Sequence, residues 1–270
     1  TAYSAGGAGL EDLTGTGNKY TITIAGGNAT DLTASQLTGL NNLTDVAVTA
    51  TAVTAIASSS LSDVSTVLAA GADAAQFTGL GTGLTSVTLA TGTIKAADFN
   101  TAITRADAIN GDATTVFEMS AGQTITAHSD DGDGTAMSHL TTLLASEATK
   151  ITTAGATGLV DQAITVQNGS ITIANANALD ATTTGVVTAT IAETAYSAGG
   201  AGLEDLTGTG NEYSITIAGG NATNLTASNL TALNAKTDAA INATAVTALA
   251  SDSLANVSTL LAAGADSDQF

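Results

Sequence analysis

An ungapped internal repeat constrains this chain more than any other feature of its sequence. Residues 1–77 align with residues 194–270 at an offset of 193 residues, and 60 of the 77 aligned pairs are identical. Self-similarity at a fixed offset is the sequence signature of tandem-repeat proteins. We therefore predict that residues 1–193 form one complete repeat unit and that residues 194–270 form the first part of the next. No Pro- or Ser-rich linker separates them, so we expect continuous structure across the junction.

The 17 differences between the copies give a first estimate of burial. Three exchanges are between apolar side chains of similar size, which indicates buried positions: Val48/Ile241, Ile56/Leu249 and Val67/Leu260. Exchanges that alter charge, such as Lys19/Glu212 and Ser59/Asp252, indicate exposed positions.

Apolar residues alternate with Thr or other polar residues in many segments. This period of two predicts half-buried strands, and Thr suits their outward face because it is β-branched. The predicted strands are Tyr20–Ile24, Val46–Val53, Val87–Leu89, Phe117–Ala121, Ile164–Ile173 and Val187–Ile191. Residues 149–193 are predicted to be almost wholly β.

Other segments have helical spacing. Apolar residues fall on one helical face in three of them: Leu61, Val64, Val67 and Leu68; Phe99, Ile103 and Ala106; and Met137, Leu140 and Leu144. Ser60 with Asp63 resembles a capping box, and Gly71 is at a helix C-cap position.

Strands therefore alternate with short helices, which favours parallel strands joined by crossovers. Small side chains and the absence of proline suit stacked coils. The expected fold is a repeat protein, a mostly parallel β-solenoid with short α-helices in the crossovers.

Charge and composition exclude several functions. Asp and Glu number 24 against five Lys and Arg, giving a formal net charge of −19, so no basic patch for nucleic acid exists. No apolar run approaches the ~18 residues of a membrane span. Two His and no Cys leave little chemistry for catalysis, and we expect a protein that is not an enzyme.

The densest acidic cluster is the segment His128-Ser-Asp-Asp-Gly-Asp-Gly134, which contains Asp130, Asp131 and Asp133. Carboxylate oxygens on a glycine-containing turn are ligands that Ca²⁺ accepts. We predict a Ca²⁺ site at these three residues. The alternative is a solvated acidic turn.

Weaker metal candidates lie elsewhere. Glu11-Asp12 recurs as Glu204-Asp205 between glycine-rich turns and is the second candidate for a cation. His128 and His139 flank the acidic turn, and His with carboxylates can bind Zn²⁺. Their spacing fits no helical register, which favours two surface histidines.

Three phrases of the sequence carry a resemblance to a known group of proteins: residues 28–41 (NATDLTASQLTGLN), 61–71 (LSDVSTVLAAG) and 176–187 (ANALDATTTGVV). The chain resembles the giant, acidic, Ala/Thr/Gly-rich repeat proteins of the surfaces of marine unicellular cyanobacteria. The resemblance implies extracellular display, secretion by a dedicated exporter, and a role for Ca²⁺. The repeated Gly-Asp nonapeptides of the haemolysin-type proteins are absent here.

The function predicted from these features is structural. We expect an extracellular fibre, or a cell-surface filament or layer, whose main partner is itself and which can also contact cell-surface polysaccharide. The alternative is the stalk of a large surface adhesin whose binding domain lies outside this sequence. A glycan-degrading enzyme is disfavoured, because the carboxylates are scattered and aromatic platforms for sugars are missing.

Overall fold

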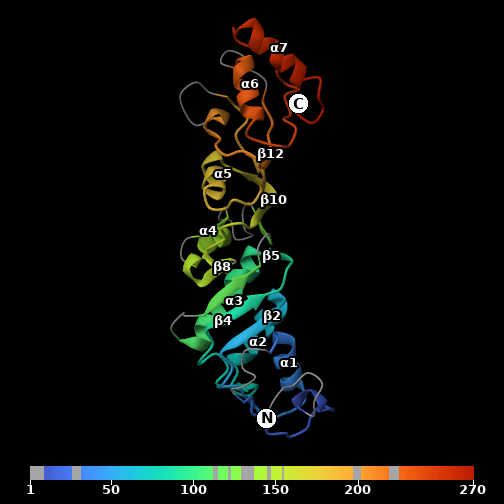
Figure 1. Ribbon diagram of the computed structural model, residues 1–270, viewed down its shortest axis with the longest axis vertical. Coiled ribbons are helices and arrows are strands. Elements are labelled where there is room, and N and C mark those ends of the chain that lie inside the picture. Colours follow the sequence, from blue (N-terminus) through green and yellow to red (C-terminus); the bar gives the residue numbers. More distant parts are fainter. Residues whose placement is uncertain are drawn as a thin grey trace. The chain divides into compact units, whose positions relative to one another are not determined.

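The computed structural model describes residues 9–25, 32–111, 115–120, 123–128, 137–144, 147–153, 155–196, 202–218 and 225–270. The chain divides into two compact units (Figure 1). The first consists of Thr1–Gln123 and His139–Val160, and the second of Thr124–Ser138 and Asp161–Phe270.

The first unit combines helices with parallel strands. Its helices are η1 (Leu10–Asp12), α1 (Ala34–Asn42), α2 (Leu61–Gly71), α3 (Ala96–Asn110), α4 (Ser138–Leu144) and η3 (Ala148–Lys150). Its strands are β1 (Val48–Thr49), β2 (Ala55–Ser59), β3 (Phe77–Thr78), β4 (Ser86–Leu89), β5 (Thr93–Lys95), β6 (Val116–Met119), β8 (Ile151–Thr153) and β9 (Ala156–Thr157). Strands β2, β4, β6 and β8 pair in chain order and in parallel, and β9 pairs antiparallel with β8. Strands β1 and β3 form a separate parallel pair.

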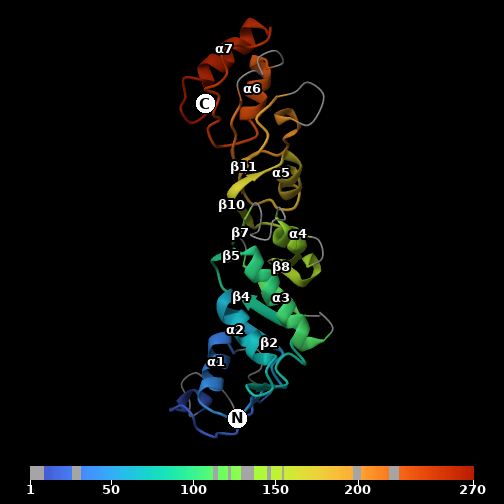
Figure 2. The same ribbon diagram turned by 180° about the vertical axis from the view of Figure 1, so that it is seen from behind.

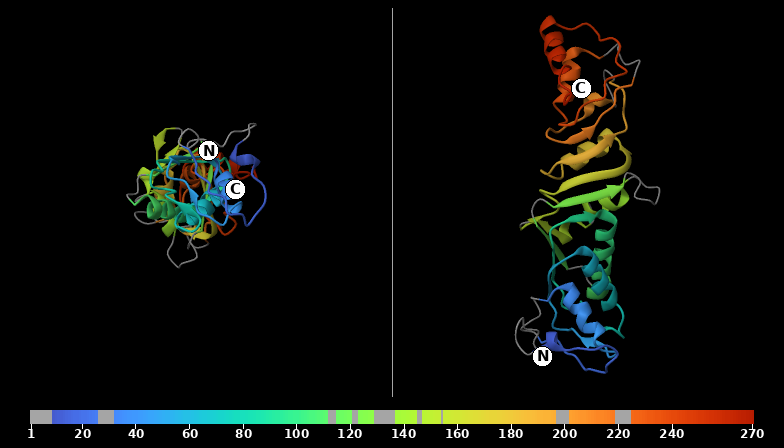
Figure 3. Two further views of the ribbon diagram at one scale, coloured as in Figure 1. Left: turned by 90° about the horizontal axis from the view of Figure 1, so that it is seen from below. Right: turned by 90° about the vertical axis from the view of Figure 1, so that its right-hand side faces the viewer.

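The second unit repeats this pattern of strand and helix. It contains β7 (Thr124–His128), β10 (Ala163–Ile171), α5 (Ile173–Asp180), β11 (Val187–Ile191), η4 (Leu203–Asp205), β12 (Glu212–Ser214), α6 (Ala227–Asn234) and α7 (Leu254–Ala263). Strands β7, β10, β11 and β12 are neighbours in chain order and all run parallel (Figure 3).

Aligned apolar side chains form the core of the first sheet. Ile56, Val87, Phe117 and Ile151 occupy paired positions on four successive strands, and each is at most 1% exposed. Because side chains alternate across a sheet, one apolar residue at each paired position places a continuous row on the buried face.

Helices lie beside these strands and add apolar side chains to the core (Figure 2). α2 packs against both α1 and α3, and it buries Val64, Val67 and Leu68 completely. The ring of Phe99 on α3 meets that of Phe117 on β6 edge to face, with centroids 5.6 Å apart. Burying side chains of this size contributes about 1.5–3 kcal/mol each.

The predicted fold class was wrong. The described residues form a mixed α/β structure with seven α-helices and three sheets, of which two are parallel throughout and one is mixed, and this is not a β-solenoid. The physical reason lies in the segments between strands. They are helices of up to 15 residues that pack on one another, as α2 does on α3, and so they build a helical layer that a β-solenoid lacks.

Individual elements match the predictions unevenly. β11 has the predicted bounds, β4 begins one residue early, and α2 begins after Ser60, whose hydroxyl accepts the Asp63 amide at 3.1 Å. Residues 20–24 form only an isolated bridge at Thr23, and Val46–Val53 is reduced to β1.

Residues 149–193 are not wholly β, because α5 begins at Ile173, after the N-cap Thr172. Ser59 is buried rather than exposed, since its hydroxyl accepts the Ala34 amide at 2.9 Å.

The two repeat copies share several hydrogen bonds. The Thr44 hydroxyl donates to the Tyr20 carbonyl at 2.8 Å, and the Thr237 hydroxyl, 193 residues later, donates to the Tyr213 carbonyl at 2.9 Å. Other bonds recur in the same way: Asn41 to Gln76 as Asn234 to Gln269, both at 3.1 Å, and the bridge Thr23–Thr49 as Thr216–Asn242. Helices α6 and α7 begin at the positions equivalent to the starts of α1 and α2.

Candidate functional site

The most distinctive surface is an apolar face at the C-terminal end of the second unit, formed by α7 and the segment preceding it. We call it the α7 face. It lines a pocket of ≈ 450 Å³ with mostly apolar side chains, among them Leu230, Val246, Leu249, Leu261 and Phe270.

Large side chains on the α7 face are exposed to solvent. Leu249 is 37% exposed, Leu261 68% and Leu254 84%. Contiguous exposed apolar surface marks an interaction site in soluble proteins. The preceding residue, Leu260, lies about 100° away around the helix and is only 9% exposed. One side of α7 therefore packs against its own unit, and another side is exposed to solvent.

A second feature is a polar groove of ≈ 550 Å³ between α2 and α3 in the first unit. Six Ser and Thr hydroxyls line it together with Lys95, Arg105 and Asp98. The guanidinium of Arg105 donates to the Ser65 carbonyl at 2.8 Å, whereas Lys95 is exposed. Two of the five cationic side chains of an acidic chain thus line one groove, where hydroxyls can bind saccharides and the cations can bind carboxylate or sulfate groups.

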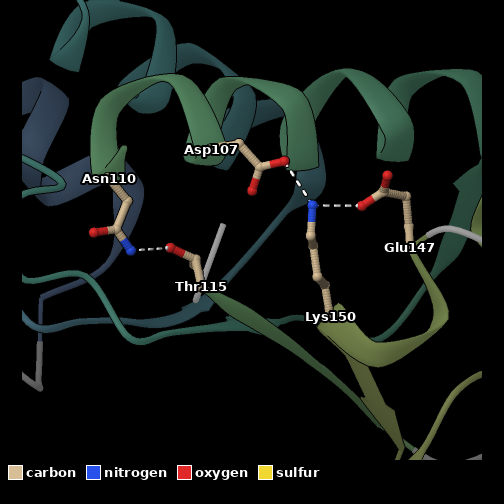
Figure 4. A network of polar contacts seen from close by, with 5 residues as sticks. All are labelled: Asp107, Asn110, Thr115, Glu147 and Lys150. Carbon is tan, nitrogen blue, oxygen red and sulfur yellow. Dashed lines mark hydrogen bonds and ion pairs between the residues drawn. The ribbon is translucent and has the colours of Figure 1, made fainter. Parts of the chain in front are cut away.

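An ion-pair network ties α3 to η3 in the first unit (Figure 4). The Lys150 ammonium lies 2.7 Å from a carboxylate oxygen of Asp107 and 2.7 Å from one of Glu147. Burial by itself lowers the pKa of Lys150. The interactions with Asp107 and Glu147 together raise it by more than burial lowers it, so the pKa lies above its usual value. Next to this network the Asn110 amide donates to the Thr115 hydroxyl at 3.1 Å and to the Leu84 carbonyl at 2.8 Å. These ion pairs connect α3 to η3, which indicates a structural role.

The predicted metal ligands are mostly beyond what the structure describes. Asp130, Asp131 and Asp133 lie outside the described residues, as do the side chains of His128 and Glu11. His139 lies on α4, where its carbonyl accepts the Asn100 amide at 2.8 Å. Within the described ranges, no group of three or more His, Asp and Glu side chains could hold a metal ion.

The repeated acidic pair is likewise not gathered into a cluster. Asp12 is exposed and accepts the Gly9 amide at 3.4 Å, and the Asp205 carbonyl accepts the Asn177 amide at 2.8 Å. The first bond is local to the start of η1, and the second joins η4 to α5. In the part of the chain that the structure describes, no helix has the length and apolar character needed to cross a bilayer.

Sequence reasoning missed the α7 face and the polar groove. The groove combines residues 60–66 with residues 93–105, and no local motif joins these two segments. Comparisons with protein-family models, with curated proteins and with solved structures found no match.

Proposed function

We propose that this protein is a non-catalytic structural repeat protein of the cell surface, built so that its repeat units assemble into a filament or layer. The observation that carries the proposal is the recurrence of the same hydrogen bonds in both copies, such as Thr44 to Tyr20 and Thr237 to Tyr213. In each copy a threonine hydroxyl joins two neighbouring backbone segments. Stability in repeat proteins is a sum over such units and their interfaces.

The strong acidity suits this role. A net charge of −19 keeps long polymers soluble and apart through like-charge repulsion. Divalent cations would screen that repulsion and allow neighbouring filaments to approach.

Immunogold labelling tests the location and the assembled form. Antibody raised against the 270-residue chain is applied to intact cells that make the protein, and to the same cells after sectioning. The proposal expects label on intact cells, distributed along fibres or a continuous layer. Label found only inside sectioned cells contradicts a surface role. Label restricted to the base of fibres that end in a separate head supports the adhesin stalk instead.

The polar groove supports contact with acidic polysaccharide as a second part of this proposal. Beyond about 8 Å the overall negative charge is screened at physiological salt, so the groove's own charges matter most, and there Lys95 and Arg105 outnumber Asp98. Polygalacturonate is the probe, and neutral dextran is its control. Binding of polygalacturonate should weaken in Lys95→Gln and stay unchanged in Lys19→Gln, because Lys19 is exposed and does not line the groove. Equal binding by both variants would exclude the groove.

A further inference from the structure

In the first repeat copy, α2 and β2 form the face that is equivalent to the α7 face, and there it is covered by other residues. The side chains of Ile56, Val64 and Leu68 are each at most 1% exposed. Their equivalents 193 residues later are Leu249, Val257 and Leu261, and none of the three is buried. The side chains are the same or nearly so, which means that the difference comes from what lies against them.

Residues 78–110 provide the cover in the first copy. Strand β4 pairs in parallel with β2, and α3 packs against α2. The Thr85 amide donates to the Thr54 carbonyl at 2.8 Å, and the Ala90 amide donates to the Ser59 carbonyl at 2.8 Å. Backbone pairing therefore adds to apolar burial along this edge.

Gly71 shows how closely the cover fits. A Cβ atom added at Gly71 would lie 3.1 Å from Leu80 and 3.3 Å from Ile109, so both side chains reach the helix backbone. The equivalent Gly264 has only carbonyl oxygens of α7 itself within 4 Å of such an atom. The second copy keeps the glycine at this position although nothing in the described residues packs on it.

Other contact groups are kept as well. Ser65, whose carbonyl accepts Arg105, corresponds to Ser258. The Ala250 amide donates to the Leu225 carbonyl at 2.9 Å, as the Ala57 amide donates to Leu32, so one edge of this segment is already paired. Among the described residues, no strand pairs with its other edge, which in the first copy pairs with β4.

We propose that the α7 face binds a segment with the sequence character of residues 78–110, which adds a parallel strand beside residues 248–252 and lays a helix on α7. Such strand addition combines main-chain hydrogen bonds with pockets for side chains. Counterparts of Leu80 and Ile109 would lie over Gly264, and a counterpart of Arg105 would bind Ser258. This inference rests on the proposed repeat-based role, since it names the contact by which one unit continues into the next.

Cysteine accessibility tests the contact, because the chain contains no cysteine of its own. Leu261→Cys is made in the 270-residue chain and in a chain extended after Phe270 by a second copy of residues 78–193. The thiol should react quickly in the first chain and at least about 100-fold more slowly in the second, where reaction requires local opening. Ala262→Cys is the matched control. Ala262 and its equivalent Ala69 are both exposed, so its thiol should react at the same rate in both chains.

A third chain tests the contacting residues. The extended chain is made with Leu80→Asp and Ile109→Asp in the appended copy only, and there the Leu261→Cys thiol should react quickly again. Protection that survives these two substitutions, or no protection in the unsubstituted extended chain, overturns the inference. Circular dichroism spectra of the Leu261→Cys chains that match those of the corresponding chains without the cysteine show that the variants fold. Surface labelling of cells is independent of this result, so failure of the contact and failure of the proposed role are distinguishable.

Discussion

Leu68 and Leu261 occupy equivalent positions of the two repeat copies, yet Leu68 is fully buried and Leu261 is 68% exposed. Truncation should therefore have unequal effects. Leu68→Ala should lower the free energy of unfolding by about 2–5 kcal/mol, because it leaves a cavity. Leu261→Ala should change it by no more than about 0.5 kcal/mol. Urea unfolding followed by circular dichroism measures both.

The control for this comparison is Leu260→Ala on the same helix, because Leu260 is only 9% exposed. It should destabilise the chain clearly. Equal losses from Leu68→Ala and Leu261→Ala would mean that the α7 face is covered in solution.

Gly39 lies within α1, and a Cβ atom added there would meet nothing within 4 Å. The second copy has Ala232 at the equivalent position of α6. Gly39→Ala should therefore raise the free energy of unfolding by about 0.5–1 kcal/mol, since alanine loses less backbone entropy in a helix. Gly81→Ala is the contrast, because its φ is +95° and the added atom would lie 2.4 Å from Ile109. That variant should be destabilised. A loss of stability in Gly39→Ala would contradict the assignment of α1.

Alkaline pH should destabilise the protein through Tyr213 and Lys150. Burial, and to a lesser degree the charge of Asp180, raises the pKa of Tyr213, and the pKa of Lys150 is raised as well. Both groups are therefore held in the protonated form in the folded state. Their contribution is complete below the usual values of 10.0 and 10.5 and is lost as pH rises above them. Melting temperature should be nearly flat up to about pH 9 and then fall.

Tyr213→Phe removes one of these two groups and keeps the buried ring. Its melting temperature should fall less steeply than that of the parent chain above about pH 10. Identical slopes for the two chains would show that Tyr213 ionises without cost in the folded state.

Calcium binding at Asp130, Asp131 and Asp133 stays a prediction of the sequence. Three carboxylates on one turn repel one another, and a cation held by oxygen ligands would relieve that repulsion. Melting temperature should rise with free Ca²⁺ above the dissociation constant. Asp131→Asn with Asp133→Asn should abolish this rise and leave the Ca²⁺-free fold intact. If chelator does not alter the melting temperature, the alternative of a solvated acidic turn without Ca²⁺ is favoured.

Sequence patterns located many elements but not their arrangement. The helical spacing of Val64, Val67 and Leu68 located α2, because all three face one core. The alternation of Ile171 and Ile173 misled, since Thr172 between them caps α5 rather than continuing β10. Where one residue can either continue a strand or cap a helix, tertiary packing determines which role it takes.

The candidate site could not be predicted from local sequence. Leu68 and Leu261 have nearly the same neighbours along the chain, and their burial differs because residues 78–110 pack against the first copy. Gly71 was assigned to a helix cap, whereas Ala72 is the cap and Gly71 admits Leu80 and Ile109. The reason for that glycine is a close approach between distant segments, which the sequence does not reveal.

Amide hydrogen exchange in α2 and α7 tests most directly the claim that each repeat unit is completed by the segment covering this face. In the 270-residue chain, the amides of residues 64–68 should exchange slowly and those of residues 257–261 much faster. In the chain extended by residues 78–193, exchange at residues 257–261 should slow to the rates of residues 64–68. Equal exchange of α7 with and without the extension would contradict the account.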